Sequence, residues 1–213
     1  MMTPAAAAGP RQRRLRPAGP GDRLCSRCAL VVFLLAACAS PGSGRVVTSL
    51  PGFDGPLPFH LETGYVEVDA QNGAELFYYF VKSESGAAAP FLLWLTGGDR
   101  CSVFSGLAFE IGPVRFVAEP YDGTLPRLQY NQNSWAKVSH ILFVDSPVGA
   151  GFSFSREPKG YDVGDISSTL QLYDFLIKWF NDHPQFLTNP FYIGGDSYAG
   201  KIAPFLAQII SEG

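Results

Sequence analysis

The sequence predicts an α/β fold, in which a mixed sheet carries helices on its faces. A hairpin signal comes first, because Asn72-Gly73 lies between two strand-like segments and accepts the positive φ that a tight turn requires. Residues 91–95 and 141–144 are short apolar runs bounded by turn residues, as buried parallel strands are. Residues 165–180 have apolar positions at helical spacing. A hairpin followed by strands that alternate with helices is typical of a layered α/β sheet.

The first 39 residues do not fit this fold and are expected to be a secretory signal peptide. An arginine-rich stretch leads into the apolar run 29–39, which is too short to span a bilayer and ends in small residues before Ser40. An arginine-rich organelle transit peptide is one alternative, and a bacterial lipoprotein signal at 35–38 is another. A secretory signal predicts that residues 40–213 are secreted or vacuolar, with no membrane attachment after cleavage.

The charge balance argues against nucleic acid or an anionic membrane as a partner. The leader holds six of the 16 basic residues and one of the 19 acidic residues, so residues 40–213 carry a net charge of −8. Such binding needs clustered lysine and arginine. The chain has 213 residues, 46% of them apolar, which is enough for one domain with a real core.

The cysteine pattern predicts no metal site. Three of the four cysteines lie in the leader, and the C-x-x-C spacing of Cys25 and Cys28 has no second pair. Cys101 is left alone in a compartment expected to be oxidising. An odd cysteine there indicates a missing partner or a free thiol.

The remaining elements follow in order along the chain. Residues 40–60 are rich in glycine and proline and are expected to be extended, whereas 65–68 and 76–81 are the expected hairpin strands. Residues 103–135 are loop-like, because glycine and proline interrupt any periodicity. Aromatic side chains recur here and just beyond; we expect packing onto the sheet for most, and pocket lining is the alternative. They are Phe109, Phe116, Tyr121, Tyr130, Trp135, Phe152 and Phe154.

The helix predicted at 165–180 has recognisable ends. Asp165 is expected to cap its start, and Pro184 is expected to stop it. Its apolar repeat falls on Leu170, Tyr173, Ile177 and Phe180.

The most specific motif is the segment 195–200, Gly-Asp-Ser-Tyr-Ala-Gly, between the apolar run 191–193 and the helix-compatible run 201–210. A serine at a strand-to-helix corner is typical of a nucleophile elbow, in which small neighbours permit a sharp turn that exposes the hydroxyl of Ser197. The N–H of Tyr198, at a helix N-terminus, can donate to a developing oxyanion. The alternative is a glycine-rich turn with an incidental serine.

The chain supplies no base after this serine. Folds with such an elbow bring an acid and then a histidine from later in the sequence. Only Glu212 is acidic after Ser197, and His60, His140 and His183 all lie upstream. Recruitment of one of these histidines in a different order is the alternative. The sequence therefore predicts the nucleophile half of an enzyme.

Four ordered segments resemble the serine carboxypeptidases and serine carboxypeptidase-like proteins, a family with the α/β-hydrolase fold. They are 94–98 (Trp-Leu-Thr-Gly-Gly), 106–113, 143–153 and the elbow, and the resemblance runs from about Leu50 to the last residue. It implies the N-terminal half of an α/β-hydrolase fold, a mixed sheet with flanking helices, truncated after the helix that follows the elbow. It implies neither a metal nor a cofactor.

The resemblance also implies roles for individual residues. These are the nucleophile Ser197, the oxyanion-hole donors Gly98 and Tyr198, and the substrate-binding residues Thr96, Gly97 and Asp196. Family peptidases carry asparagine at the position of Thr96 and glutamate at that of Asp196, and these side chains grip a peptide's C-terminal carboxylate. Thr96 and Asp196 look instead like the plant acyltransferase branch, which transfers acyl groups from glucose esters. A peptidase that tolerates both changes is the alternative.

The chain departs from the family at Asp99-Arg100, where Pro-Gly is usual. If the glycine position needs a positive φ, Arg100 is strained there, and its cation lies beside the substrate site. Family members also pair the cysteine at the position of Cys101 with a later segment that this chain lacks.

These features predict acyl-enzyme chemistry, with a small-molecule acyl ester or a peptide C-terminus as the partner. The chain alone is expected to be inactive, because the acid and the histidine of the triad are missing. A non-catalytic truncated remnant or a binding protein is the alternative. Self-association is expected through the outward edge of the strand at 191–194 or through Cys101.

Overall fold

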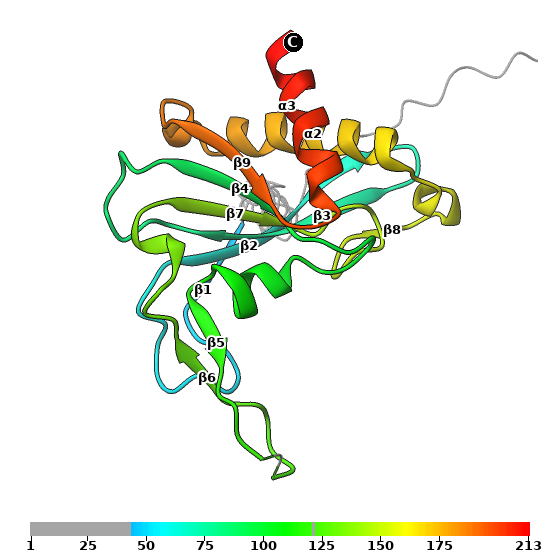
Figure 1. The fold of residues 1–213 in the computed structure, drawn as a ribbon. Helices are drawn as coiled ribbons and strands as arrows, with labels where there is room; N and C mark the ends of the chain where they lie inside the picture. Colours follow the sequence, from blue (N-terminus) through cyan, green and yellow to red (C-terminus); the bar gives the residue numbers. More distant parts are fainter. Residues whose placement is uncertain (1–43, 121) are drawn as a thin grey trace, which may run out of the picture. The chain divides into compact units, whose positions relative to one another are not determined.

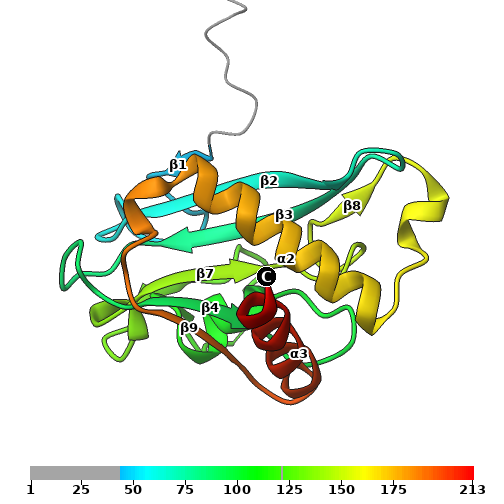
Figure 2. The ribbon, with the colours of Figure 1, turned by 90° about the horizontal axis from the view of Figure 1, so that it is seen from above.

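The computed structural model describes residues 44–120 and 122–213, so the predicted signal peptide and Tyr121 lie outside the described residues. The main sheet has seven strands in the order β1-β2-β3-β7-β4-β9, with β8 paired to β3 (Figures 1 and 2). They are β1 (Arg45–Val47), β2 (Leu61–Asp69), β3 (Ala74–Val81), β4 (Phe91–Leu95), β7 (His140–Val144), β8 (Phe154–Ser155) and β9 (Phe191–Gly195). The predicted mixed sheet is confirmed, because β1, β2, β3 and β7 pair antiparallel and β4 is parallel to both β7 and β9.

The β2–β3 hairpin forms at the predicted turn. Gly73 has φ +61°, where a glycine carries no steric cost. Asp69 closes the turn, because its carboxylate accepts hydrogen bonds from Gln71 N and from Asn72 N and Nδ2. A short local signal thus specifies the turn that joins the two longest antiparallel strands.

The parallel strands determine where a site can form. β4 and β7 are buried along their whole length, as central strands between two covered faces are. Phe91 is in register with both His140 and Phe191, so β4, β7 and β9 begin at one edge of the sheet and end at the other. Ligands of open α/β sheets bind outside such carboxyl ends. Among the described strands β9 is outermost and pairs with β4 alone.

Two helices cover one face of the sheet, and a loop-rich segment covers the other (Figure 1). α2 (Asp165–Asp182) and α3 (Ala199–Glu212) pack on a core that includes Phe80, Phe91 and Trp179. A second core lies on the other face of the sheet and includes side chains from residues 103–137. That segment holds the π-helix η1 (Gly106–Glu110), the strands β5 (Val114–Phe116) and β6 (Leu128–Tyr130), and the 3-10 helix η2 (Trp135–Lys137). None of the helices in the described part of the chain is long and apolar enough to cross a membrane.

The described loop aromatics contact the sheet or one another, although Phe109, Trp135 and Phe152 remain 63%, 47% and 60% exposed. Phe116 and Tyr130 contact the second core, and Phe109 stacks on Phe116. Phe152 packs edge-on against Phe77 of β3. None of the described aromatic residues between 103 and 154 lines the cavity found at the candidate site.

The start of α2 differs from the prediction that Asp165 caps it. Gly164 is the N-cap, and its N–H donates to Ser167 Oγ at 3.0 Å. The Asp165 carboxylate instead accepts a hydrogen bond from the hydroxyl of Tyr198, so it serves a tertiary contact. The end is as predicted: α2 stops at Asp182, and Pro184 opens the short helix η4 (Pro184–Phe186), while η3 (Pro158–Tyr161) precedes α2.

The buried face of α2 matches only half of the apolar repeat seen in the sequence, because Tyr173 and Phe180 pack partly buried against the core. Leu170 and Ile177 are 51% and 48% exposed. The buried side chains include Leu172, Phe175 and Trp179. Phe175 and Trp179 pack edge-on against Tyr78 of β3, and these aromatic contacts fix the rotation of the helix.

Candidate active site

Ser197 lies at a sharp turn between β9 and α3. It has φ +49°, a strained conformation for a residue other than glycine, and its side chain is exposed. Two backbones approach closely here, because a Cβ added to Gly195 would lie 2.5 Å from Leu95 O and 2.7 Å from the Cβ of Ala199. The turn therefore needs small residues two positions before and two positions after Ser197, at Gly195 and Ala199, as the sequence predicts.

The glycine loop after β4 lies against this elbow. Gly97 N donates to Asp196 Oδ1 at 2.6 Å, and a Cβ added to Gly97 would lie 2.6 Å from the Cβ of Ser197. Gly98 has φ +85°, which again requires glycine. Neither Gly98 N nor Tyr198 N finds an acceptor among the described residues, so both N–H groups are free to donate. Free N–H donors beside a serine are what an oxyanion hole needs.

Thr96 and Asp196 lie beside the same loop, and each side chain has one oxygen in a hydrogen bond within the protein. Thr96 Oγ1 accepts a hydrogen bond from Ser105 Oγ at 3.2 Å. Asp196 uses one carboxylate oxygen as an acceptor for the backbone of Gly97. Both side chains therefore brace the site through contacts within the protein.

The turn 98–101 places Arg100 in the left-handed region. Cys101 N donates to Gly98 O at 3.1 Å, and of the two central residues Arg100 alone takes a positive φ, at +60°. This is the pattern of a type II turn, which favours proline and then glycine at its centre. An arginine there costs about 1–3 kcal/mol. Cys101 is exposed and has no disulfide partner among the described residues.

Asp145, which sequence reasoning missed, anchors the next part of the loop. It is fully buried and accepts hydrogen bonds from Ser102 Oγ and Val103 N at 2.8 Å and from Phe152 N at 2.9 Å. Burial raises the pKa of Asp145, although these hydrogen bonds act in the opposite direction. Its place at the end of a buried strand within the 143–153 motif was the available signal.

A cavity of about 100 Å³ lies between these segments. Its wall is formed by four stretches of chain, which contribute Thr96, Gly98, Asp99, Arg100, Ser146, Val163, Asp165 and Tyr198 among other residues. The hydrogen bond to Asp165 is the main reason that the pKa of the Tyr198 phenol is raised, because it stabilises the protonated form. This contact ties the elbow to the start of α2.

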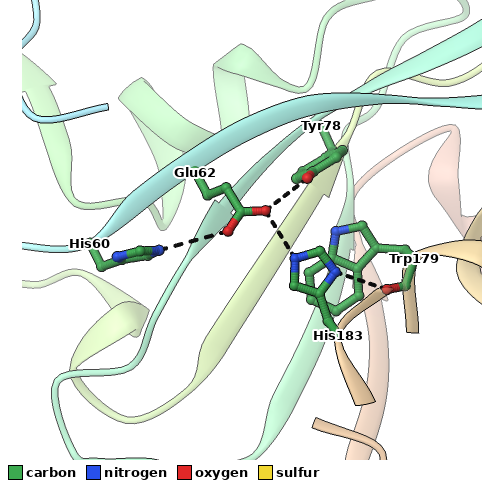
Figure 3. Close-up of polar contacts among 5 residues, drawn as sticks. All are labelled: His60, Glu62, Tyr78, Trp179 and His183. Atoms are coloured by element: carbon green, nitrogen blue, oxygen red, sulfur yellow. Dashed lines mark hydrogen bonds and ion pairs between the residues drawn. The ribbon is translucent and has the colours of Figure 1, made fainter. Parts of the chain in front are cut away.

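His183 lies in a buried polar cluster far from Ser197 (Figure 3). Its Nε2 is 3.0 Å from Glu62 Oε1, an oxygen that also accepts from Tyr78 OH at 2.8 Å, and its Nδ1 is 2.9 Å from Trp179 O. Burial is the largest single influence and lowers the pKa of His183, but the hydrogen bonds to Glu62 and Trp179 and the nearby charges of Glu62 and Asp182 together leave the pKa raised. Glu62 lies on β2, and β3, β7 and β4 separate it from β9, a span of roughly 19 Å at the usual strand spacing.

The other two histidines, His60 and His140, also lie away from Ser197. His60 Nε2 lies 3.9 Å from Glu62 Oε2 in the same cluster. His140 begins β7 at the opposite edge of the sheet, and its Nδ1 accepts from Ser83 N at 3.0 Å. Recruitment of an upstream histidine to Ser197 is therefore wrong for this structure. The described residues also contain no group of three or more side chains suited to a metal ion.

An open α/β sheet that ends in a serine elbow beside a glycine loop defines the α/β-hydrolase class. The chain belongs to the serine carboxypeptidase family, whose model matches residues 51–213.

Two similar plant proteins and one solved structure support membership of this family. The chain is 49% identical to serine carboxypeptidase-like 13 of Arabidopsis thaliana over 185 residues, which cover 86% of this chain and 43% of that protein. It is 49% identical to serine carboxypeptidase-like 7 of the same plant over 193 residues, 90% of this chain and 44% of that one. A prohormone-processing carboxypeptidase of Saccharomyces cerevisiae superposes with a TM-score of 0.64 at 29% identity, covering 79% of this chain and 38% of that one. The chain thus spans less than half the length of these relatives.

Proposed function

We propose that Ser197 is the nucleophile of an acyl-enzyme reaction and that Gly98 N–H and Tyr198 N–H stabilise the oxyanion. The observation that carries this proposal is the positive φ of Ser197 in a turn pressed against Gly97. Strain at an exposed serine persists only where the surroundings impose it, and such strain gathers at functional sites. Removing one oxyanion donor costs about 3 kcal/mol of transition-state stabilisation in such enzymes.

We propose acyl transfer from a glucose ester rather than removal of a C-terminal amino acid. A peptide carboxylate is held by hydrogen-bond donors, whereas Thr96 brings a single hydroxyl, whose oxygen accepts from Ser105, and Asp196 serves as the acceptor for Gly97 N. Removal of a C-terminal residue is the competing outcome.

The reaction requires a base that the described residues do not bring to Ser197. We therefore expect the 213-residue chain to be inactive by itself and to act only when joined to the part of a relative that it does not match.

We also propose that the protein enters the secretory pathway, as its N-terminal sequence predicts. N-terminal sequencing of the secreted product would detect cleavage after residue 39.

Substrate choice is tested on such a joined protein, with the two rates measured on one preparation. We expect transfer from a glucose ester to be faster than release of a C-terminal amino acid. In the double variant Thr96→Asn and Asp196→Glu the ratio should shift toward peptide cleavage, because both donors to a carboxylate return. Faster peptide cleavage by the unmodified chain would refute acyl transfer. Retention of both activities in Ser197→Ala would refute Ser197 as the nucleophile, and absence of both activities in the joined protein would leave a binding role.

A further inference from the structure

Arg100 joins three segments of the chain that lie far apart in the sequence. Its Nη1 donates to Val148 O at 2.8 Å, and its Nη2 donates to Tyr161 O at 3.4 Å and to Val163 O at 3.2 Å. Tyr161 is the last residue of η3, Val163 lies in the loop between η3 and α2, and Val148 lies in the loop after β7. The guanidinium is a planar fork of donors, which suits several carbonyls at once.

The fit around the guanidinium is close. A Cβ added to Gly149 would lie 3.4 Å from Arg100 Nη1 and 3.2 Å from Cδ1 of Tyr161. Gly149 has φ +92°, so glycine is also needed there for the backbone. Arg100, Val163 and Tyr198 all line the same cavity.

We propose that Arg100 is a positioning residue, whose guanidinium holds the turn 98–101 against the loops 146–149 and 161–164 and so fixes the wall of the cavity. Glycine at position 100 would relax the turn but would leave the carbonyls of Val148, Tyr161 and Val163 without this donor. The strained φ of Arg100 is therefore retained for its contacts. The loop geometry is independent of any reaction, whereas its effect on Gly98 as an oxyanion donor rests on the proposed function.

The test is hydrogen exchange of the full chain, followed peptide by peptide. In Arg100→Ala we expect exchange to rise about tenfold in segments 97–103, 146–150 and 161–166, because three hydrogen bonds to a charged group are lost. Exchange in β3 should not change. Arg127→Ala is the matched control, since Arg127 is an exposed arginine whose ion pair is with Glu119, and it should leave all three segments as they are.

Chemical rescue separates positioning from general destabilisation. Methylguanidinium added to Arg100→Ala should restore protection in the three segments, and methylammonium at the same concentration should not. Arg100→Lys should fall between the wild type and Arg100→Ala. Unchanged exchange at 146–150 and 161–166 would overturn the proposal, as would a rise that includes β3 and is not rescued.

If Arg100→Ala does not fold, hydrogen exchange of Arg100→Lys tests the proposal instead. A rise confined to the three segments supports the proposal, and wild-type protection there overturns it. Because exchange requires no turnover, the result stands whether or not acyl transfer is found.

Discussion

Gly97 is the residue at which the loop after β4 touches the elbow. A Cβ at this position would lie 2.6 Å from the Cβ of Ser197 and 3.0 Å from Asp196 O, and the second of these is backbone that cannot rotate away. Gly97→Ala should therefore destabilise the fold by about 1–3 kcal/mol. The free energy of unfolding in urea measures the change.

Gly200→Ala is the matched control for Gly97→Ala. Gly200 lies in α3 with no heavy atom within 4 Å of an added Cβ, so alanine should stabilise the helix by about 0.5–1 kcal/mol. Equal effects of the two substitutions would show that the elbow and the loop are not in contact.

Single residues were predictable from the sequence where a local rule governs them. The turn at Gly73 and the elbow at Ser197 each carry their own signal, because positive φ and tight approach select glycine and small residues. The contact of Glu62 with His183 joins residues 121 positions apart, and that of Tyr198 with Asp165 joins residues 33 apart. No local pattern encodes such pairs, so sequence reasoning missed them.

At the level of elements, the sequence predicted which segments are helices and strands better than it predicted which face they bury. α2 has apolar residues on more than one face, and in the predicted repeat Leu170 and Ile177 are about half exposed, whereas Tyr173 and Phe180 pack against the core. Aromatic packing of Phe175 and Trp179 on β3 selects the buried face. This selection is tertiary, because it depends on where β3 lies under the helix. The same holds for Asp165, whose tertiary bond to Tyr198 replaces the predicted cap.

For the whole molecule, the buried cluster around Glu62 predicts how stability depends on pH. Burial lowers the pKa of His183, yet its hydrogen bonds to Glu62 and Trp179 and the nearby carboxylates of Glu62 and Asp182 together leave the pKa raised above 6.5. His183 thus contributes stability that is complete below pH 6.5 and is lost as the pH rises through its folded pKa. Burial raises the pKa of Glu62, but its hydrogen bonds to His183 and Tyr78 and the nearby histidines together leave the pKa below 4.5. The contribution of Glu62 to stability is therefore lost as the pH falls through this lowered pKa of the folded state.

Glu62→Gln tests this dependence. The substitution should cost about 1–3 kcal/mol near pH 5.5, where Glu62 is ionised and His183 is protonated, and less at a second, alkaline pH above the raised pKa of His183. Denaturant unfolding at the two pH values measures the difference. Glu67→Gln, an exposed position on the same strand, should show no such dependence. A cost that does not change with pH would exclude a charged His183 in the folded state.

Fluorophosphonate labelling tests whether Ser197 is the nucleophile. The 213-residue chain alone should not react, because a serine without a base is a poor nucleophile at neutral pH. Joined to the part of a relative that it does not match, the chain should label stoichiometrically at Ser197, and Ser197→Ala should abolish the labelling. Labelling that persists in Ser197→Ala, or stoichiometric labelling of the chain alone, would contradict this account.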